Sequence, residues 1–180
     1  MNASDNSPFR GLGGIFLIGF MGSGKTHWGR LWGQQTGMSF FDLDEIIEEQ
    51  EHKTIAEIFE QNGEVYFRQK ETEVLKTFSE KKNCIIACGG GTPCFNNNMQ
   101  WMNEHGTTIY LSATANDIVK RVITEQEKRP LIKDLHPTEL LSFVEKKLKE
   151  REPFYTTAKI ILPVKEITVE SINGIISNLK

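Results

Sequence analysis

The 180-residue sequence predicts an α/β fold in which helices cover a parallel β-sheet, and two observations support that prediction. Short apolar runs typical of buried strands alternate along the chain with longer segments whose apolar residues recur at helical spacing. A glycine-rich segment also separates the first apolar run, residues 15–18, from the first helical segment, residues 25–35. A chain of this length buries about 70% of its unfolded surface in one domain. We expect residues 1–13 to form a flexible tail and residues 14–180 a single domain.

Composition and charge exclude several classes of partner. Lys and Arg number 21 against 24 Asp and Glu, a formal net charge of -3, so no overall basic field attracts nucleic acid or an anionic membrane. The three cysteines lack the CxxC spacing of a zinc site, which favours core thiols in a reducing compartment. The sequence shows neither a signal peptide pattern nor an apolar run of membrane-spanning length. We expect a monomeric, cytoplasmic protein that acts on a small molecule.

The glycine-rich segment, residues 19–26, fits the pattern of a phosphate-binding loop: Gly, four variable residues, then Gly-Lys-Thr. Its glycines let successive backbone N–H groups turn inward on phosphates, Lys25 reaches the β and γ oxygens, and the Thr26 hydroxyl can ligate Mg²⁺. The helix at residues 25–35, which Gly37 ends, points its positive end at those phosphates. A chance glycine turn is the alternative, but the flanking strand and helix favour a nucleoside triphosphate site.

The second predicted strand, residues 39–44, ends in an acidic pair and precedes a helix at residues 45–51. Asp42 and Asp44 stand two apart at the carboxyl end of that strand, the edge where open α/β sheets bind ligands. Both are therefore expected to face the phosphate loop. The alternative is that Asp44 only caps the following helix.

Two helices come next, the first beginning with a capping box at residues 54–57 and ending at Gly63, the second spanning residues 64–81. Arg68 lies near the start of the second helix, where the helix dipole disfavours a cation by roughly 0.3 to 1 kcal/mol. Its presence there suggests an anionic partner. An exposed surface arginine explains the same clue equally well.

A third strand, residues 83–88, ends in three consecutive glycines at positions 89–91. Glycines are expected where backbone approaches a ligand closely or adopts a positive φ, and this strand end opens on the same crevice. A flexible turn is the alternative. The alternation of helix and strand then continues through a helix at residues 96–105, a strand at residues 107–111 and a helix at residues 114–124.

The pattern breaks at residues 124–137, a charged, proline-containing stretch that we interpret as a mobile lid, with Arg129 able to reach a transferring phosphate. A helix at residues 138–152 follows and is expected to end at Pro153. Arg151 stands at its end, where a cation that simply complements the helix dipole is the alternative to a ligand-binding role. A fifth strand at residues 159–162 and a helix at residues 168–179 complete the chain. The four histidines show no metal-site spacing.

Six short motifs occur here in the order seen in shikimate kinases: the phosphate loop, Phe-x-Asp-x-Asp, Gly-Glu-x-x-Phe-Arg, Gly-Gly-Gly, Arg-Pro-Leu and Arg-x-Pro-x-Tyr. Each is weak alone, but six in order make the resemblance specific, and it covers residues 14–179. The resemblance implies the three-layer fold of P-loop kinases, with a five-stranded parallel sheet in the order 2-3-1-4-5 and a mobile lid. It also implies Mg²⁺- and ATP-dependent phosphorylation of the 3-hydroxyl of shikimate.

The resemblance implies roles for the matching residues. Asp44 would accept a hydrogen bond from the reacting hydroxyl, with Lys25 and Arg129 as the other catalytic residues. The shikimate-binding residues would be Asp44, Arg68, Gly89, Gly90, Gly91 and Arg151. The ATP-binding residues would be Gly22, Ser23, Gly24, Lys25, Thr26, His27, Arg121, stacked on adenine, and Arg129. The Mg²⁺ ligands would be Thr26 and Asp42. Paired guanidinium groups are what a planar carboxylate binds best, which agrees with the arginines.

The sequence departs from the family in two places. The family usually has a small residue after Lys-Thr, whereas His27 and Trp28 stand here, and the segment expected to contact adenine, residues 163–169, has no recognisable motif. Two alternative functions remain open. A gluconate kinase would share the fold but would not need paired carboxylate-binding arginines, and a nucleotide-dependent switch would have no acceptor substrate.

Overall fold

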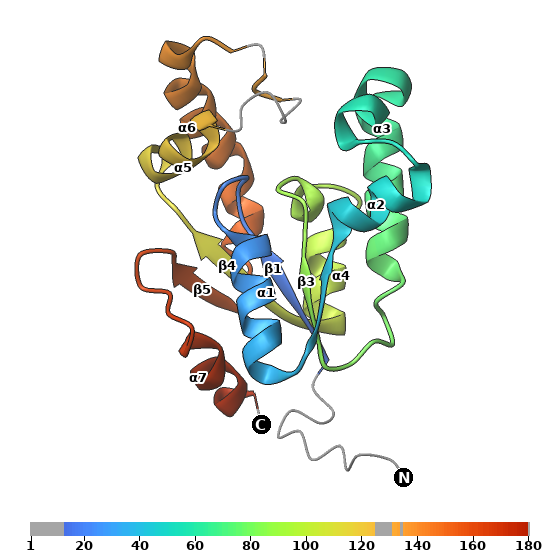
Figure 1. The fold of residues 1–180 in the computed structure, drawn as a ribbon, viewed down its shortest axis with the longest axis vertical. Helices are drawn as coiled ribbons and strands as arrows, with labels where there is room; N and C mark the ends of the chain where they lie inside the picture. Colours follow the sequence, from blue (N-terminus) through green and yellow to red (C-terminus); the bar gives the residue numbers. More distant parts are fainter. Residues whose placement is uncertain (1–12, 125–130, 134, 180) are drawn as a thin grey trace.

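A five-stranded, fully parallel sheet forms the centre of the computed structural model, which describes residues 13–124, 131–133 and 135–179 (Figure 1). The strand order is β2-β3-β1-β4-β5, so both the predicted fold class and the order implied by the resemblance are confirmed. The strands are β1 (Gly14–Ile18), β2 (Ser39–Asp42), β3 (Cys84–Ala87), β4 (Gly106–Ser112) and β5 (Ile160–Pro163).

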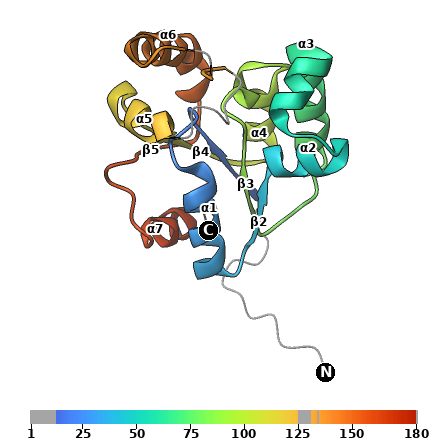
Figure 2. The ribbon, with the colours of Figure 1, turned by 45° about the horizontal axis from the view of Figure 1, so that its top comes forward.

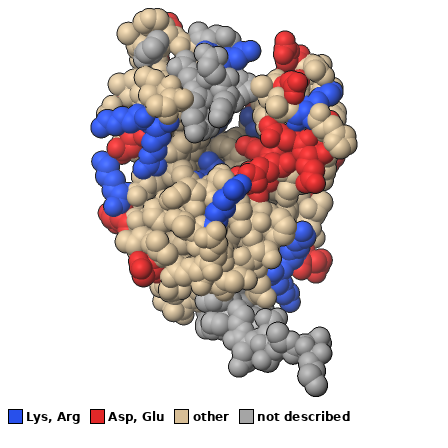
Figure 3. Space-filling view, viewed as in Figure 1, with Lys and Arg blue, Asp and Glu red and all other residues tan. Residues whose placement is uncertain are grey.

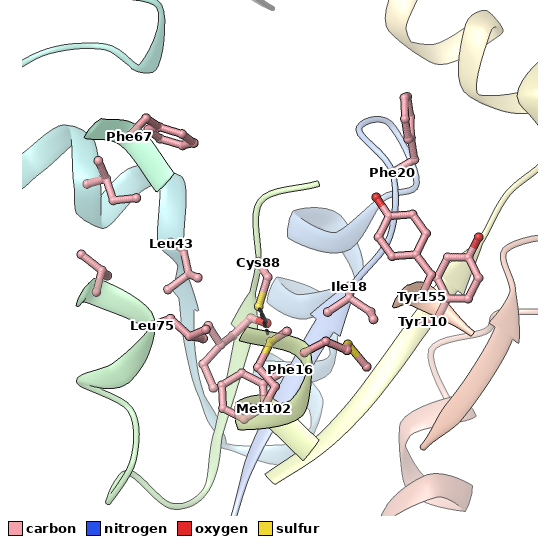
Figure 4. Close-up of a cluster of buried hydrophobic side chains, with 14 of the residues drawn as sticks. Phe16, Ile18, Phe20, Leu43, Phe67, Leu75, Cys88, Met102, Tyr110 and Tyr155 are labelled. Carbon is pink, nitrogen blue, oxygen red and sulfur yellow. Dashed lines mark hydrogen bonds between the residues drawn. The ribbon is translucent and has the colours of Figure 1, made fainter. Parts of the chain in front are cut away.

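Alternate side chains of the strands enter two separate hydrophobic layers, because successive residues of a strand point to opposite faces of the sheet. In β1, Phe16 and Ile18 face one layer, drawn in Figure 4, while Ile15 and Leu17 face the other. Helices α2 to α6 contribute to the first layer, and α1 and α7, which lie together in Figure 2, cover the second. The helices are α1 (Lys25–Thr36), α2 (Leu43–Glu51), α3 (Ile55–Lys76), α4 (Asn98–His105), α5 (Ala115–Val122), α6 (Pro137–Tyr155) and α7 (Ser171–Asn178).

The boundary between β2 and α2 differs from the prediction. The strand ends at Asp42 and the helix begins at Leu43, so Asp44 lies in the first helical turn and not on the strand. Asp42 is the N-cap, and its Oδ1 accepts a hydrogen bond from the backbone N–H of Asp44 at 3.1 Å. The prediction that Asp44 ends the strand is wrong, and so is the alternative that Asp44 is the cap.

Two helix ends also differ from the prediction. The capping box of Thr54 and Glu57 is confirmed, and so is the break at Gly63, whose non-helical backbone (φ 80°, ψ 171°) makes a kink that divides α3 into two helical segments. The second segment ends at Lys76 and not at the predicted residue 81. Pro153 does not end α6, because a proline this close to the C-terminus removes only one of the last backbone hydrogen bonds. The helix continues to Tyr155, one turn beyond Arg151.

The three cysteines are free thiols, and Cys84 and Cys88 are buried while Cys94 is half-buried. This agrees with the predicted core positions. Figure 4 shows the contact between Cys88 and Met102 beneath the sheet. Within the described ranges, no helix combines the length and the apolar character that crossing a lipid bilayer requires.

Candidate active site

Two adjoining cavities open at the carboxyl ends of the central strands. The phosphate-loop cavity, of about 590 Å³, lies over residues 21–28 and reaches Asp42 and Arg121. The arginine cavity, of about 470 Å³, contains Arg68 and Arg151. Four residues line both cavities: Met21, Asp44, Gly89 and Gly90. A reaction between two ligands, one in each cavity, would therefore take place beside Asp44.

The phosphate loop has the backbone that an anion cradle requires. Gly19, Gly22 and Gly24 have φ values of 142°, 75° and 93°, and α1 begins directly after the loop, so its free N–H groups face the cavity. Nζ of Lys25 donates to two backbone carbonyls at the start of the loop, at 3.0 Å each, which holds the ammonium group beside the cradle. The Ser23 hydroxyl is buried and has no hydrogen-bond partner among the described residues. The loop is therefore shaped for phosphate.

Thr26 and Asp42 lie together at the floor of the phosphate-loop cavity. The Thr26 hydroxyl donates to Asp42 Oδ2 at 2.7 Å, which brings a hydroxyl and a carboxylate oxygen to one point. The described residues contain no cluster of three or more His, Cys, Asp or Glu side chains that could hold a metal by themselves. A site with two protein oxygens suits Mg²⁺, which usually keeps several waters and takes further ligands from substrate phosphates.

Four further residues line the phosphate-loop cavity and not the arginine cavity: His27, Trp28, Arg121 and Val164. Arg121 extends from α5 and donates from Nη1 to the Gly22 carbonyl at 3.1 Å, so it lies directly on the loop. Val164 comes from residues 163–169, where the sequence contained no motif. Its backbone N–H donates a hydrogen bond to the Ser112 carbonyl at the end of β4. Because this contact joins distant segments, the sequence alone did not identify Val164 as a site residue.

Asp44 sits at the junction of the two cavities in an unusual electrostatic setting. Its Oδ1 is buried and has no hydrogen-bond partner within the described part of the chain. Burial, reinforced by the negative charges of Glu71 and Asp42, raises the pKa of Asp44 to about 7, although Lys25 and Arg68 partly offset the effect. A carboxylate with a pKa near neutrality is suited to accept a proton from a substrate hydroxyl.

Arg68 is a buried residue, so the alternative of an exposed surface arginine is wrong. Only 6% of its surface is exposed, and it donates to Glu71 Oε2 at 2.8 Å and to Glu64 Oε1 at 3.0 Å. Glu71 is fully buried and also accepts a hydrogen bond from the Thr92 hydroxyl. Sequence reasoning missed Glu71, although its position three residues after Arg68 on one helix indicates such a pair. Glu71 fixes the guanidinium at the wall of the arginine cavity.

Arg151 has no such partner. It is 9% exposed and packs its guanidinium 5.1 Å from the centre of the Phe20 ring, and no ion pair joins it to any carboxylate in the described ranges. The alternative of a cation that complements the helix end is not supported, because the last turn of α6 contains no basic residue. A buried guanidinium without a counter-charge is costly unless a ligand supplies one.

The glycine run brings its backbone against the charged groups of the site. A methyl group added at Gly91 would lie 2.6 Å from the Arg68 guanidinium, and one at Gly90 would lie 3.2 Å from Nη1 of Arg151. None of the three glycines has a positive φ, so close approach is the reason for glycine here, and a flexible turn is not. The Tyr155 hydroxyl donates to the Gly90 carbonyl at 2.5 Å, and Figure 4 shows this ring beside Tyr110. One turn of α6 thus brings both Arg151 and Tyr155 to Gly90.

Arg129 and much of the predicted lid lie outside the described residues, which omit 125–130 and 134. In the described remainder, Leu131 lines the arginine cavity and Ile132 is buried. Leu131 was not among the predicted site residues, because its place in the cavity wall depends on how residues 131–133 fold against the rest of the chain.

Charged side chains are unevenly distributed around the site. Figure 3 shows acidic side chains gathered over α2 and α3 on one side and basic side chains at the level of α5 on the other.

Comparisons with known proteins agree with this geometry. A family model described as shikimate kinase matches residues 21–180. The shikimate kinase of Azobacteroides pseudotrichonymphae is 44% identical over 166 residues, which is 92% of this chain and 96% of that protein. The crystal structure of the shikimate kinase from Bacteroides thetaiotaomicron is 36% identical, with a TM-score of 0.82 over 92% of this chain and 95% of that one. A shikimate kinase from Acinetobacter baumannii, solved in complex with shikimate, is 32% identical, with a TM-score of 0.83 over 95% of this chain and 94% of that one. The chain belongs to the shikimate kinase family.

Proposed function

We propose that this protein is a shikimate kinase that transfers the γ-phosphoryl group of ATP to the 3-hydroxyl of shikimate, a step of aromatic amino-acid biosynthesis. Family membership supports the reaction class, and the shikimate-bound relative supports the acceptor. The two adjoining cavities provide one site for each substrate. We further propose that the enzyme acts as a cytoplasmic monomer, as the composition suggests.

The observation that carries the acceptor assignment is the guanidinium of Arg151, which forms no ion pair with a carboxylate of the described residues. With Arg68 it places two arginines in one cavity of about 470 Å³, and a carboxylate bound between them would compensate the Arg151 charge. Gluconate carries a carboxylate as well, so the acceptor is distinguished by the apolar wall of Phe59, Phe67 and Leu131, which suits the carbon ring of shikimate better than an open polyhydroxyl chain. Backbone of Gly89, Gly90 and Gly91 would contact the same substrate.

The phosphate-loop cavity would hold ATP with its γ-phosphate directed at the junction with the arginine cavity. The loop residues Gly22, Ser23, Gly24, Lys25 and Thr26 would bind the phosphates, His27 would lie beside them, and Arg121 would contact the adenine end. Thr26 and Asp42 would hold Mg²⁺, which when bound neutralises phosphate charge. Arg129, which lies outside the described residues, is assigned to ATP by its motif alone.

The transfer forms a bond between the 3-oxygen of shikimate and the γ-phosphorus and breaks the bond between that phosphorus and the oxygen that bridges to the β-phosphate. Shikimate 3-phosphate and ADP result. Asp44, at the junction, would orient the 3-hydroxyl and accept its proton, and Lys25 would stabilise the charge on the transferring group. Both residues line the phosphate-loop cavity.

The function is tested by measuring ADP release with shikimate, with gluconate and with no acceptor. Fast release that depends on shikimate is expected. Release that depends on gluconate would identify a different small-metabolite kinase, and equal release in all three reactions would indicate a nucleotide-dependent switch.

Arg151→Met is expected to weaken shikimate binding by on the order of a hundredfold, because a bidentate charge-assisted pair is lost. The KM for ATP should change little. The variant should be at least as stable as the parent, because the substitution removes a buried charge that has no ion-pair partner in the described ranges. Shikimate KM, ATP KM and thermal unfolding without ligands check the three expectations.

Arg68→Met is the matched comparison. It should also weaken shikimate binding, but it removes the cation paired with the fully buried Glu71 and should cost roughly 3 to 5 kcal/mol of stability. If Arg151→Met instead raises the KM for ATP as much as that for shikimate, Arg151 belongs to the nucleotide site and the acceptor assignment is wrong.

A further inference from the structure

We propose that Trp28 is a nucleotide-binding residue whose indole ring contacts the nucleoside part of ATP. The inference rests on the proposed function, since it requires that the phosphate-loop cavity takes a nucleotide. Trp28 occupies one of the two positions where the sequence departs from the family's small residue after Lys-Thr. The surroundings of Trp28 in the structure indicate the role of this tryptophan.

The geometry of the reaction decides which end of the cavity receives the nucleoside. The phosphoryl group to be transferred must lie at the junction beside Asp44, where the two cavities meet. The phosphate chain then follows the loop toward the start of α1. The nucleoside must therefore lie away from the junction, and Trp28, Arg121 and Val164 line this cavity without lining the arginine cavity.

The Trp28 ring and the Arg121 guanidinium both lie close to Gly24 of the loop. A methyl group added at Gly24 would lie 3.2 Å from Trp28 Cδ1 and 3.9 Å from Arg121 Nη1. The ring is half-buried, so part of it remains open to the cavity. Aromatic faces and guanidinium planes are the two groups on which proteins stack nucleic-acid bases. Both are present here, within reach of one ligand.

Two neighbouring aromatic rings fix the position of the Trp28 ring. Trp28 packs on Trp32, with ring centroids 5.9 Å apart, and the His27 ring meets it edge-on at 5.2 Å. Trp32 is fully buried, and its Nε1 donates to the Thr168 carbonyl at 3.3 Å. This contact ties the aromatic stack to the segment that also brings Val164 to the cavity. A ring fixed in this way loses little freedom when a ligand binds, which favours affinity.

Trp28→Leu tests the proposal, because leucine keeps an apolar contact with Trp32 and removes the aromatic face. Calorimetric titration with ADP and with inorganic pyrophosphate separates the nucleoside from the phosphates. We expect ADP affinity to fall about tenfold, the usual range for loss of one base–aromatic contact, and pyrophosphate affinity to stay within twofold of the parent. Trp28→Phe should recover most of the ADP affinity.

Fluorescence gives a second readout that does not depend on turnover. The ADP-induced change in tryptophan emission should persist in Trp101→Phe, since Trp101 lies on α4 against His105 and does not line the phosphate-loop cavity. It should be largely lost in Trp28→Phe.

Three results would overturn the inference. If the parent binds ADP and Trp28→Leu binds it equally well, Trp28 has no role in binding and the proposed function is untouched. If pyrophosphate affinity falls as far as ADP affinity, the substitution has distorted the loop and the ring is structural. If the parent binds no ADP, the proposed function fails and the role of Trp28 fails with it.

Discussion

Replacing Lys25 by Met is expected to lower kcat by about 10³-fold or more while the fold stays intact. The ammonium group is fixed beside the phosphate cradle by two hydrogen bonds to backbone carbonyls, each 3.0 Å long. Its charge acts on the phosphoryl group during transfer, when negative charge redistributes toward the leaving oxygen. Methionine keeps the length of the side chain and removes that charge. The measurement is kcat with saturating ATP and shikimate, together with the melting temperature.

Lys76→Met provides the control, because Lys76 is an exposed lysine at the end of α3 and lines neither cavity. Its kcat should match the parent. Retention of more than a tenth of the parental kcat by Lys25→Met, in a folded protein, would remove Lys25 from the catalytic residues and with it the nucleotide assignment of the loop.

The parts of the fold that could be predicted are those fixed by local sequence. The first strand, the glycine loop and the start of α1 lie where the pattern placed them, because the apolar run favours a buried strand and the loop's glycines permit the positive φ values that the loop adopts. The Thr54 capping box lies as predicted for the same reason. The strand order, in contrast, came from the family resemblance, since periodicity does not determine how strands neighbour one another.

The parts that could not be predicted depend on contacts between distant segments. Whether Asp42 or Asp44 caps α2 depends on which carboxylate turns back to the helix, and both residues suit a cap. The burial of Arg68 depends on Glu71 and on the approach of Gly91 from another strand end. Arg151 lies outside the last turn of α6 because the helix runs past Pro153, where a proline rule predicted an end. Asp44, Arg68, Gly91 and Arg151 all line the arginine cavity, so tertiary packing, more than local sequence, builds the substrate site.

At Asp44, the ionised form that can accept a proton also destabilises the folded protein. The pKa of this carboxyl is raised from 3.8 to about 7 by burial first and then by Glu71 and Asp42. A raised pKa means that the folded state binds the proton more tightly than the unfolded state. The ionised form therefore destabilises the fold, and stability falls as the pH rises from about 4 through 7. At pH 8 the cost approaches about 4 kcal/mol.

Asp44→Asn should consequently lower kcat by roughly 10²- to 10⁴-fold, because the amide cannot accept the hydroxyl proton, while both substrates still bind. In EDTA and without nucleotide, the variant should be more stable than the parent at pH 8, and the difference in stability should vanish near pH 4.

Asp117→Asn is the control. The hydrogen bond with Thr114 lowers the pKa of Asp117, so this substitution should reduce stability at pH 8. The measurements are kcat at saturating ATP and shikimate and thermal unfolding at both pH values. Asp42 is the cap of α2, so the loss of Asp44 leaves that cap in place. A kcat within tenfold of the parent would show that Asp44 is not the proton acceptor.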